Sequence, residues 1–553
     1  MRLLWLCLLP GLWCAAQETP EPGTLTGIVL DANTGEPVAR AALTLSLAAR
    51  PGLSIDELPP HHETITASNG RFRFIALPPG RYYLRARKAG YLLQHYNPRP
   101  RATGAASIPV SAGPAPTQVE MRLLPQAVVS GRVLDENGEP VERAHVALEA
   151  LEYSPLGRQQ LWPTQNTATS DLGEFRFAGL PPGRYYLWTR LRPTLMIEDL
   201  PRLRDPDVEI ETDYVPVYYP NSPDIEGATP IDLEPGSDIQ GLDIRPRKFP
   251  VYRISGRVAA HDVPGAPTKL MLFPHQSSPL AALAGPRTRI QPDGRFEFAG
   301  VPPGRYHIAA LHEGGEGRNP WLWQSEVHIG KRDVTNVTIA YNEPARIACD
   351  LSIEGDDSDA PTRAPIVVSL MPMEGPIVAT PHGRSEHRRT FAIESVVPGH
   401  YWVQVSGRPQ PDSWLKSIIF DGREVDESGL VLQPGASARL TLVFAPNAAS
   451  LAGAVVNRDG ETVPGVTVAL VPERPNPTRR DLYPTAVTSS DGSVELKDLA
   501  PGRYFLFAFD HLPPGAHLDP EFLKPHLSRA TRLEIEPGGR HQITLRHRAT
   551  PAK

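Results

Sequence analysis

Alternating apolar and polar positions stand at the centre of five similar segments of the chain. The clearest copy runs from Gly70 to Leu84 and reads GRFRFIALPPGRYYL. Phe-x-Phe and Tyr-x-Leu have a period of two, which predicts two strands that each bury alternate residues against a core. Pro-Pro-Gly between them fixes two φ angles and then supplies a permissive residue, so it predicts a stiff corner.

The same segment recurs along the whole chain. Strong copies begin at Gly173 and Gly294, and weaker copies begin at Phe391 and Gly492. The glycines of the five corners are therefore 103, 121, 95 and 103 residues apart, and they are Gly80, Gly183, Gly304, Gly399 and Gly502. A period of about 100 residues is the size of a domain, so the pattern predicts a row of domains and not a solenoid of short repeats.

Two further signatures flank each central segment. An opening strand pattern starts at Leu25, Val129, Ile254 and Leu451, and weakly at Ala345 with Cys349 where the others have glycine. A glycine-bearing turn follows it at Gly35, Gly138 and Gly460. A closing pattern places two short strands around a glycine, at 108–121, 231–244, 327–339, 430–442 and 533–545. Opening, central and closing pairs give six to seven strands in about 100 residues, the rhythm of an antiparallel β-sandwich.

Composition supports this interpretation and narrows the partners. The 553 residues include 62 Pro and 45 Gly, too many for a helix-dominated protein and too few for a low-complexity chain. The 56 basic and 62 acidic residues give a net charge of −6. No basic field is present to attract nucleic acid or anionic lipid, so we predict no nucleic-acid partner.

The first 16 residues have the features of a secretory signal. One arginine precedes a short apolar run, and small residues end it at Ala16. The run is about half the length of a spanning helix, and no later segment is apolar enough, so we predict no membrane span in the mature chain. The protein is expected to be exported, to the periplasm, the cell surface or the medium. The mature chain keeps one cysteine, Cys349, so it has no internal disulfide, and we expect a buried structural thiol.

The opening Gly-x-Val-x-Asp and the central Phe-x-Phe-x-x-Leu-Pro-Pro-Gly-x-Tyr resemble the carboxypeptidase regulatory-like domain. The resemblance implies a transthyretin-like sandwich, grouped with carbohydrate-binding-like folds, in a multi-repeat exported bacterial protein. The fold class predicted is thus all-β, a tandem array of about five Ig-like or transthyretin-like antiparallel β-sandwiches. The predicted divisions are a signal peptide at 1–16 and repeats at 17–124, 125–247, 248–344, 345–446 (degenerate) and 447–553.

Signatures of catalysis are absent from the sequence. No histidine has a glutamate three residues later, no His-Glu-x-x-His occurs, and neither a Gly-x-Ser-x-Gly elbow nor a phosphate-binding Gly-x4-Gly-Lys loop is present. Asp31, Asp135 and Asn457 begin Asx-type turns that lack the carboxylates of a calcium loop. His382 and His387 are expected to be solvated. We therefore predict no enzyme, no catalytic residue, no cofactor and no metal.

Aromatic side chains are the remaining candidates for a binding site. Tyr214, Tyr218 and Tyr219 stand among prolines in the longest interval of the repeat, and Trp321 and Trp323 alternate near the end of the third. Aromatic faces stack on sugar rings, which makes them possible ligand-binding residues. The alternative is that they pack over loops or against the next domain.

Regular repeats without catalytic signatures predict a non-catalytic scaffold or interaction protein of the bacterial cell envelope. The alternative function is polysaccharide binding through exposed aromatics. Envelope proteins or a polysaccharide are the expected partners, and the chain is expected to be monomeric.

Overall fold

The computed structural model describes residues 21–48, 61–154, 156–191, 211–259, 269–274, 286–312, 321–340, 342–356, 361–373, 380–476 and 478–547. The predicted signal peptide lies outside the described residues. Strands dominate the fold, which confirms the predicted all-β class of tandem sandwiches.

The first domain shows the plan that the others repeat. One sheet has the order β4 (Arg71–Leu77), β1 (Gly23–Asp31), β8 (Thr117–Leu123). The other has the order β3 (His61–Ile65), β2 (Ala42–Leu47), β5 (Gly80–Arg87), β6 (Gln94–His95), and β7 (Ile108–Val110) also pairs with β5. We call these the opening sheet and the central sheet, because they contain the opening strand and the strand after the corner. Their inner faces enclose one apolar core.

The second and third domains keep both sheets. The second has an opening sheet of β12 (Glu174–Leu180), β9 (Ala127–Arg132) and β17 (Asp238–Ile239), and a central sheet of β11 (Gln159–Ala168), β10 (His145–Tyr153), β13 (Gly183–Arg190), β15 (Val217–Tyr218) and β16 (Ile231–Leu233). The third has β22 (Arg295–Val301), β19 (Tyr252–Val258) and β25 (Val334–Ile339), and β21 (Arg287–Arg289), β20 (Lys269–Pro274), β23 (Gly304–His312) and β24 (Trp321–Ile329). A ribbon of β14 (Thr212–Tyr214) and β18 (Lys248–Pro250) lies where the two domains join.

The fourth and fifth domains follow the same order. The fourth has β29 (Thr390–Val396), β26 (Ala345–Ile353), β34 (Ser437–Ala445), β31 (Trp414–Phe420) and β32 (Arg423–Glu424), and β28 (His382–Arg384), β27 (Val367–Pro372), β30 (Gly399–Ser406) and β33 (Leu430–Leu432). The fifth has β38 (Ser493–Leu499), β35 (Ala449–Val456) and β41 (Arg540–Arg546), and β37 (Thr485–Val487), β36 (Thr467–Pro472), β39 (Gly502–Phe509) and β40 (Thr531–Ile535). Its short helices are η3 (Arg480–Leu482), η4 (Ala516–Leu518), α2 (Pro520–Leu523) and η5 (Lys524–Arg529).

One pairing differs from the purely antiparallel expectation. The opening strand pairs in parallel with the closing strand in every domain, as in β1 with β8 and β35 with β41. A parallel neighbour brings its backbone close to the opening strand. A Cβ on Gly453 would stand 2.0 Å from the Ile543 carbonyl oxygen, and one on Gly256 would stand 1.9 Å from that of Val337. In these domains the glycine of the opening signature lets the closing strand approach closely, whereas the fourth domain forms the same parallel pair with Cys349 at this position.

The tyrosine of the central motif fixes the corner before it. In each domain its hydroxyl donates to the backbone carbonyl four residues earlier, at 2.7 to 3.0 Å; the pairs are Tyr82 with Pro78, Tyr185 with Pro181, Tyr306 with Pro302, Tyr401 with Val397 and Tyr504 with Ala500. The rings are buried in the five domain cores. The motif thus combines a stiff turn, a core aromatic and a hydrogen bond that ties the two together.

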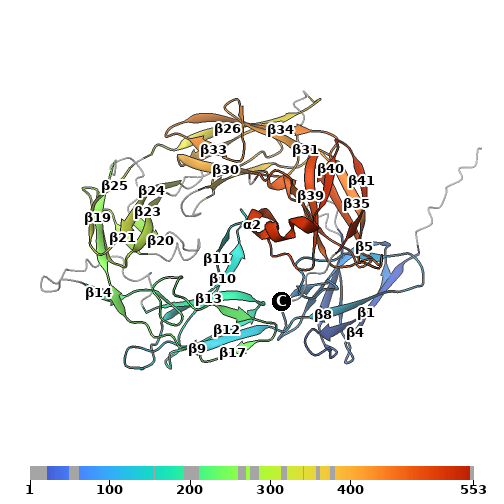
Figure 1. Cartoon of the computed structure of the whole chain (residues 1–553), viewed down its shortest axis with the longest axis horizontal. Coiled ribbons are helices and arrows are strands. Elements are labelled where there is room, and N and C mark those ends of the chain that lie inside the picture. The colour runs from blue at the N-terminus through green and yellow to red at the C-terminus, as the bar shows by residue number, and fades with distance from the viewer. Residues whose placement is uncertain are drawn as a thin grey trace, which may run out of the picture.

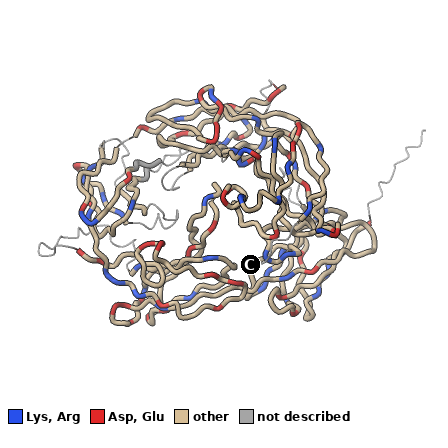
Figure 2. The backbone as a smooth tube through the Cα atoms, in the orientation of Figure 1, with Lys and Arg blue, Asp and Glu red and all other residues tan. Residues whose placement is uncertain are grey.

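The five sandwiches follow one another around a ring, and the first domain returns to lie beside the fifth (Figure 1). In the second to fifth domains the central sheet lies on the inner side of the ring, as β10, β20, β30 and β39 show, and the opening sheet lies on the outer side. Basic and acidic residues alternate around the whole ring without a large area of one sign (Figure 2). No helix within the described ranges is long and apolar enough to cross a bilayer.

Candidate functional site

The contact between the first and fifth domains closes the ring. It is made by residues 97–107, between β6 and β7, which we call the closure loop. The Arg99 guanidinium pairs with the Asp510 carboxylate, and its Nε donates to the Pro464 carbonyl oxygen at 3.2 Å. The hydroxyl of Thr103 donates to the Leu512 carbonyl oxygen. These partners are more than 360 positions apart in the chain, so the contact joins its two ends.

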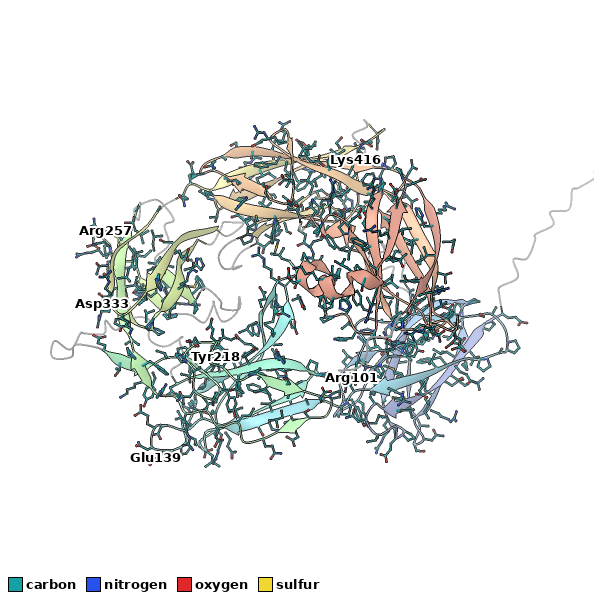
Figure 3. The ribbon with its side chains drawn as sticks, viewed as in Figure 1. Arg101, Glu139, Tyr218, Arg257, Asp333 and Lys416 are labelled. Atoms are coloured by element: carbon teal, nitrogen blue, oxygen red, sulfur yellow. The ribbon has the colours of Figure 1, made fainter. Side chains whose placement is uncertain are left out.

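Backbone groups extend the same contact. The amide of Ser490 donates to the Ser107 carbonyl oxygen at 3.0 Å, and His511 Nδ1 lies 2.8 Å from the carbonyl oxygen of Arg101. Arg101 also pairs with Glu234 of the second domain at 2.8 Å, and Figure 3 places it between the first and second domains. The closure loop therefore holds three domains together.

Two glycines let the backbones of this contact approach closely. A Cβ on Gly465 would stand 2.2 Å from Asn97 Oδ1, and one on Gly104 would stand 2.7 Å from a methyl carbon of Val487. Val487 packs against the core of the first domain although it belongs to the fifth. The first and fifth domains are therefore closely packed at this interface.

A second connection crosses the inside of the ring. The hairpin of β10 and β11 extends from the second domain toward the fifth (Figure 1). At its tip, the Tyr153 ring lies edge-to-face on Phe522 with centroids 5.9 Å apart, and the Arg158 guanidinium lies over the Trp402 ring at 5.0 Å. A Cβ on Gly157 would stand 2.8 Å from the backbone of Leu518. The hairpin thus links the second domain to the fourth and fifth.

The three predicted tyrosines do not share one site. Tyr218 lies on β15 and faces the inner side of the second domain, where Figure 3 labels it. Tyr219 packs against the core of that domain. Tyr214 lies on β14 beneath the Lys248 ammonium, 5.5 Å from its ring centroid. Each ring is partly buried by the chain itself.

Trp321 and Trp323 lie on β24, opposite His312 and Ala310 of β23. Their side chains lie outside the described residues. As ligand-binding residues, these two tryptophans and the three tyrosines stay a prediction.

Tyr218 belongs to a polar cluster on the inner face of the second domain. Its neighbour across the strands is Trp188, and His145 stands opposite Arg190. The His145 and Trp188 rings lie 5.3 Å apart, and Glu149, on the same face, is 2% exposed. We call His145, Glu149, Trp188, Arg190 and Tyr218 the inner-face cluster.

Burial sets the protonation states in this cluster. Burial, then the carboxylates of Glu149 and Glu226, raise the pKa of the Tyr218 phenol. Burial, then the charge of Arg190, lower the pKa of His145. Both groups are therefore neutral at pH 7.

Acid should weaken the folded ring. Burial is the first cause that lowers the pKa of four histidines, His145, His517, His526 and His547, and it lowers that of His517 to about 4. A lowered pKa in the folded chain means that protons bind the unfolded chain more tightly than the folded one. The contribution of these histidines to the free energy of unfolding is therefore complete above about pH 6.5 and is lost as the pH falls toward 4. We expect the melting temperature to fall over this interval, and His517→Gln to reduce the slope. A melting temperature constant from pH 7 to pH 4 would contradict this.

No grouping of three or more histidine, cysteine, aspartate or glutamate side chains that would suit a metal occurs within the described ranges. His382 lies on β28 and contacts the Thr380 carbonyl oxygen, whereas His387 contacts that of Thr362.

Cys349 is 1% exposed on β26, where Phe391 and Leu440 flank it on the neighbouring strands. Burial, with the nearby Asp350 charge, raises the pKa of its thiol to about 12. Iodoacetamide at pH 8 should therefore leave folded residues 17–553 unlabelled and label one thiol in urea. Rapid labelling of the folded chain would show that the thiol is accessible and reactive.

The contacts that unite the ring were not predicted from the sequence. The closure loop reads NPRPRATGAAS, which has the composition of a connection. Its prolines and glycine predict a turn-rich segment, and they do not indicate which domain that segment contacts. The length of β10 and β11, with 9 and 10 residues, is the feature that distinguishes the extended hairpin.

The model of the carboxypeptidase regulatory-like domain matches residues 24–123 and 128–190. The first domain and about half of the second therefore match the carboxypeptidase regulatory-like domain, which confirms the family resemblance there. The later three domains repeat the same strand order. No curated protein matches the sequence.

Several solved pilins resemble the chain in part. The minor pilin GBS52 of Streptococcus agalactiae is 15% identical, covers 41% of this chain and 97% of its own, and has a TM-score of 0.22. The shaft pilin SpaA of Lactobacillus rhamnosus GG is 12% identical, with 41% and 97% covered and a TM-score of 0.21. The major pilin subunit BcpA of Bacillus cereus is 12% identical, with 58% and 99% covered and a TM-score of 0.15. At such scores these similarities carry no conclusion about function.

Proposed function

We propose that this protein is an exported, non-catalytic scaffold of the bacterial cell envelope that binds its partners as one ring-shaped body. The observation that carries the proposal is ring closure by the contact of Arg99 and Thr103 with the fifth domain. A row of independent domains would change shape freely, whereas a closed ring holds its surfaces in fixed relation. Fixed surfaces reduce the ordering cost of binding, which suits an interaction protein.

Burial of the inner-face cluster fits a structural role for it, because Glu149 is 2% exposed and Trp188 is 8% exposed. The regulatory-like family of the first two domains fits the same role. Export rests on the predicted signal at 1–16, which a mass measurement of the protein from its producing cells will test. The expected mature chain begins at Gln17.

Affinity capture tests the scaffold directly. Residues 17–553 are immobilised and exposed to an envelope fraction, beside a ring-opened chain with Arg99→Glu. We expect envelope components that bind the closed ring and bind the opened chain at least tenfold less. Equal recovery on both chains, or no recovery on either, would contradict a scaffold that depends on its ring.

Polysaccharide binding remains the alternative proposal. Tyr218 is the residue to test, because it is partly exposed on the inner side of the ring, although its neighbour Trp188 is buried. A glycan panel with residues 17–553 and with Tyr218→Ala tests it. Binding that the substitution abolishes would support the alternative, and a panel without binding would reject it.

A further inference from the structure

The central sheet of the first domain has a face, on the side away from its core, that no described segment of the chain covers, whereas the same face is covered in the other domains. In the second to fifth domains this face carries Trp188, Phe273, Trp402 and Phe507, each at most 8% exposed. In the fifth domain η4, α2 and η5 pack on it, and in the third domain Val397 of the fourth packs on it. This face of the sandwich is thus a protein-binding surface elsewhere in the same chain.

In the first domain the face exposes large apolar side chains. Ile65 on β3 is 64% exposed, Leu93 just before β6 is 57% exposed, and Tyr83 on β5 is 41% exposed. Arg85 and Arg87 point to the same side of β5 and are exposed, and no ion pair within the described ranges engages either. Tyrosine and arginine beside exposed aliphatic groups are the usual composition of a protein interface.

Strand register arranges this face in rows across β3, β2, β5 and β6. One row has Ile65, Ala42 and Arg87, and alternation from His95 adds Leu93. The next row contains Glu63, Thr44, Arg85 and His95. The last contains His61, Ser46 and Tyr83. Small side chains therefore follow β2 and large ones follow β5.

We propose that this open face binds the same face of a second copy of the chain, across a two-fold axis parallel to the strands and between β2 and β5. Such an axis places β3 of one copy over β6 of the other and β2 over β5. Ile65 then meets Leu93 of the second copy, and Glu63 meets His95. The small Ala42, Thr44 and Ser46 receive the large side chains of β5.

The pairing is self-complementary, as a two-fold interface requires. The apolar Ile65 of one copy meets the apolar Leu93 of the other, and the large side chains of β5 fill the space over the small side chains of β2. Arg85 and Arg87 lie over Thr44 and Ala42, not over each other, so like charges are separated. An acidic partner of another kind would leave Ile65 and Leu93 without apolar contacts, so the second copy fits the face better.

The size of the face sets the expected strength. Four strands and three rows span about 20 by 20 Å, so about 400 Å² on each copy, which is the size of a weak, transient interface. We therefore expect a reversible dimer that forms at micromolar to near-millimolar concentration.

Analytical ultracentrifugation of residues 17–553 over a wide concentration range tests the proposal. We expect a monomer–dimer equilibrium that Ile65→Asp with Leu93→Asp weakens at least tenfold. Ile75→Asp is the matched control, because Ile75 is 62% exposed in the same domain but lies on β4 of the other sheet. It should leave the dimer unchanged, and equal melting temperatures show that all chains are folded.

A cysteine crosslink tests the axis itself. A mixture of Ile65→Cys chains with Leu93→Cys chains should form a disulfide-linked pair on mild oxidation, faster than either variant alone. A monomer at every concentration, a dimer that survives Ile65→Asp with Leu93→Asp, or equal crosslinking of single variants would overturn the proposal. So would a monomer that binds an acidic glycan such as polygalacturonate through Arg85.

Discussion

Replacing Arg99 by glutamate is expected to open the ring. The Arg99 guanidinium pairs with Asp510 and donates to the Pro464 carbonyl oxygen, in a contact where both charged side chains are partly buried. The glutamate would place two carboxylates against each other and would leave the Pro464 oxygen without this donor. Loss of a hydrogen-bonded charge pair at this partly exposed position costs roughly 1 to 3 kcal/mol. The distance between spin labels on the first and fifth domains, measured by pulsed electron resonance, should change from one short value to a broad distribution.

The charge-exchanged chain provides the control. Arg99→Glu combined with Asp510→Arg restores the opposite charges across the same contact, and it should recover most of the short-distance population. His547 Nε2 lies 3.2 Å from Asp510 Oδ1, so full recovery is not expected. A short distance that persists in the single variant would show that Arg99 does not hold the ring closed.

Removing the corner tyrosine is expected to give the largest loss of domain stability. Tyr82 is 1% exposed in the core of the first domain, and its hydroxyl donates to the Pro78 carbonyl oxygen at 2.7 Å. Tyr82→Ala removes a fully buried ring and should cost about 3 to 5 kcal/mol. Tyr82→Phe removes only the hydrogen bond and should cost about 1 kcal/mol. Amide hydrogen exchange of β1 and β5 measures these losses within the first domain.

The adjacent residue supplies the matched control. Tyr83 differs from Tyr82 by one position in the same strand but faces solvent. Tyr83→Phe should change the free energy of unfolding by less than about 0.5 kcal/mol. Equal losses for Tyr82→Phe and Tyr83→Phe would show that the corner hydrogen bond does not stabilise the domain.

The repeated sandwich could be predicted because its signals are local and recur five times. Phe72, Phe74 and Tyr82 show their buried face through a period of two, and the structure buries all three. The parallel pairing of opening and closing strands could not be predicted from the alternation of residues. The direction of the closing strand depends on the path of the chain between the two sheets, which the alternation does not specify. The recurring glycine at 27, 256 and 453 fits that pairing, because the backbone of the parallel neighbour lies against it, and the fourth domain forms the pair with Cys349 instead.

The candidate site was harder to predict than the fold. The sequence marks Tyr218 as an aromatic among prolines, but it does not show that Glu149 of β10 and Trp188, one residue past the Tyr-x-Leu motif on β13, are its neighbours. Closure of the ring depends on the relative orientation of neighbouring domains. A few side chains, such as Arg99, fix that orientation. Contacts of that kind leave no periodicity in the sequence, so they became visible only in the assembled ring.

Small-angle X-ray scattering of residues 17–553 at low concentration tests the central claim, that the five sandwiches form a closed ring. Each domain is about 30 Å long along its strands, so five domains end to end would reach about 150 Å. A closed ring predicts a much shorter maximum dimension and a distance distribution that falls to zero without an extended tail. A maximum dimension near that of the open row, in the unmodified chain, would contradict the account.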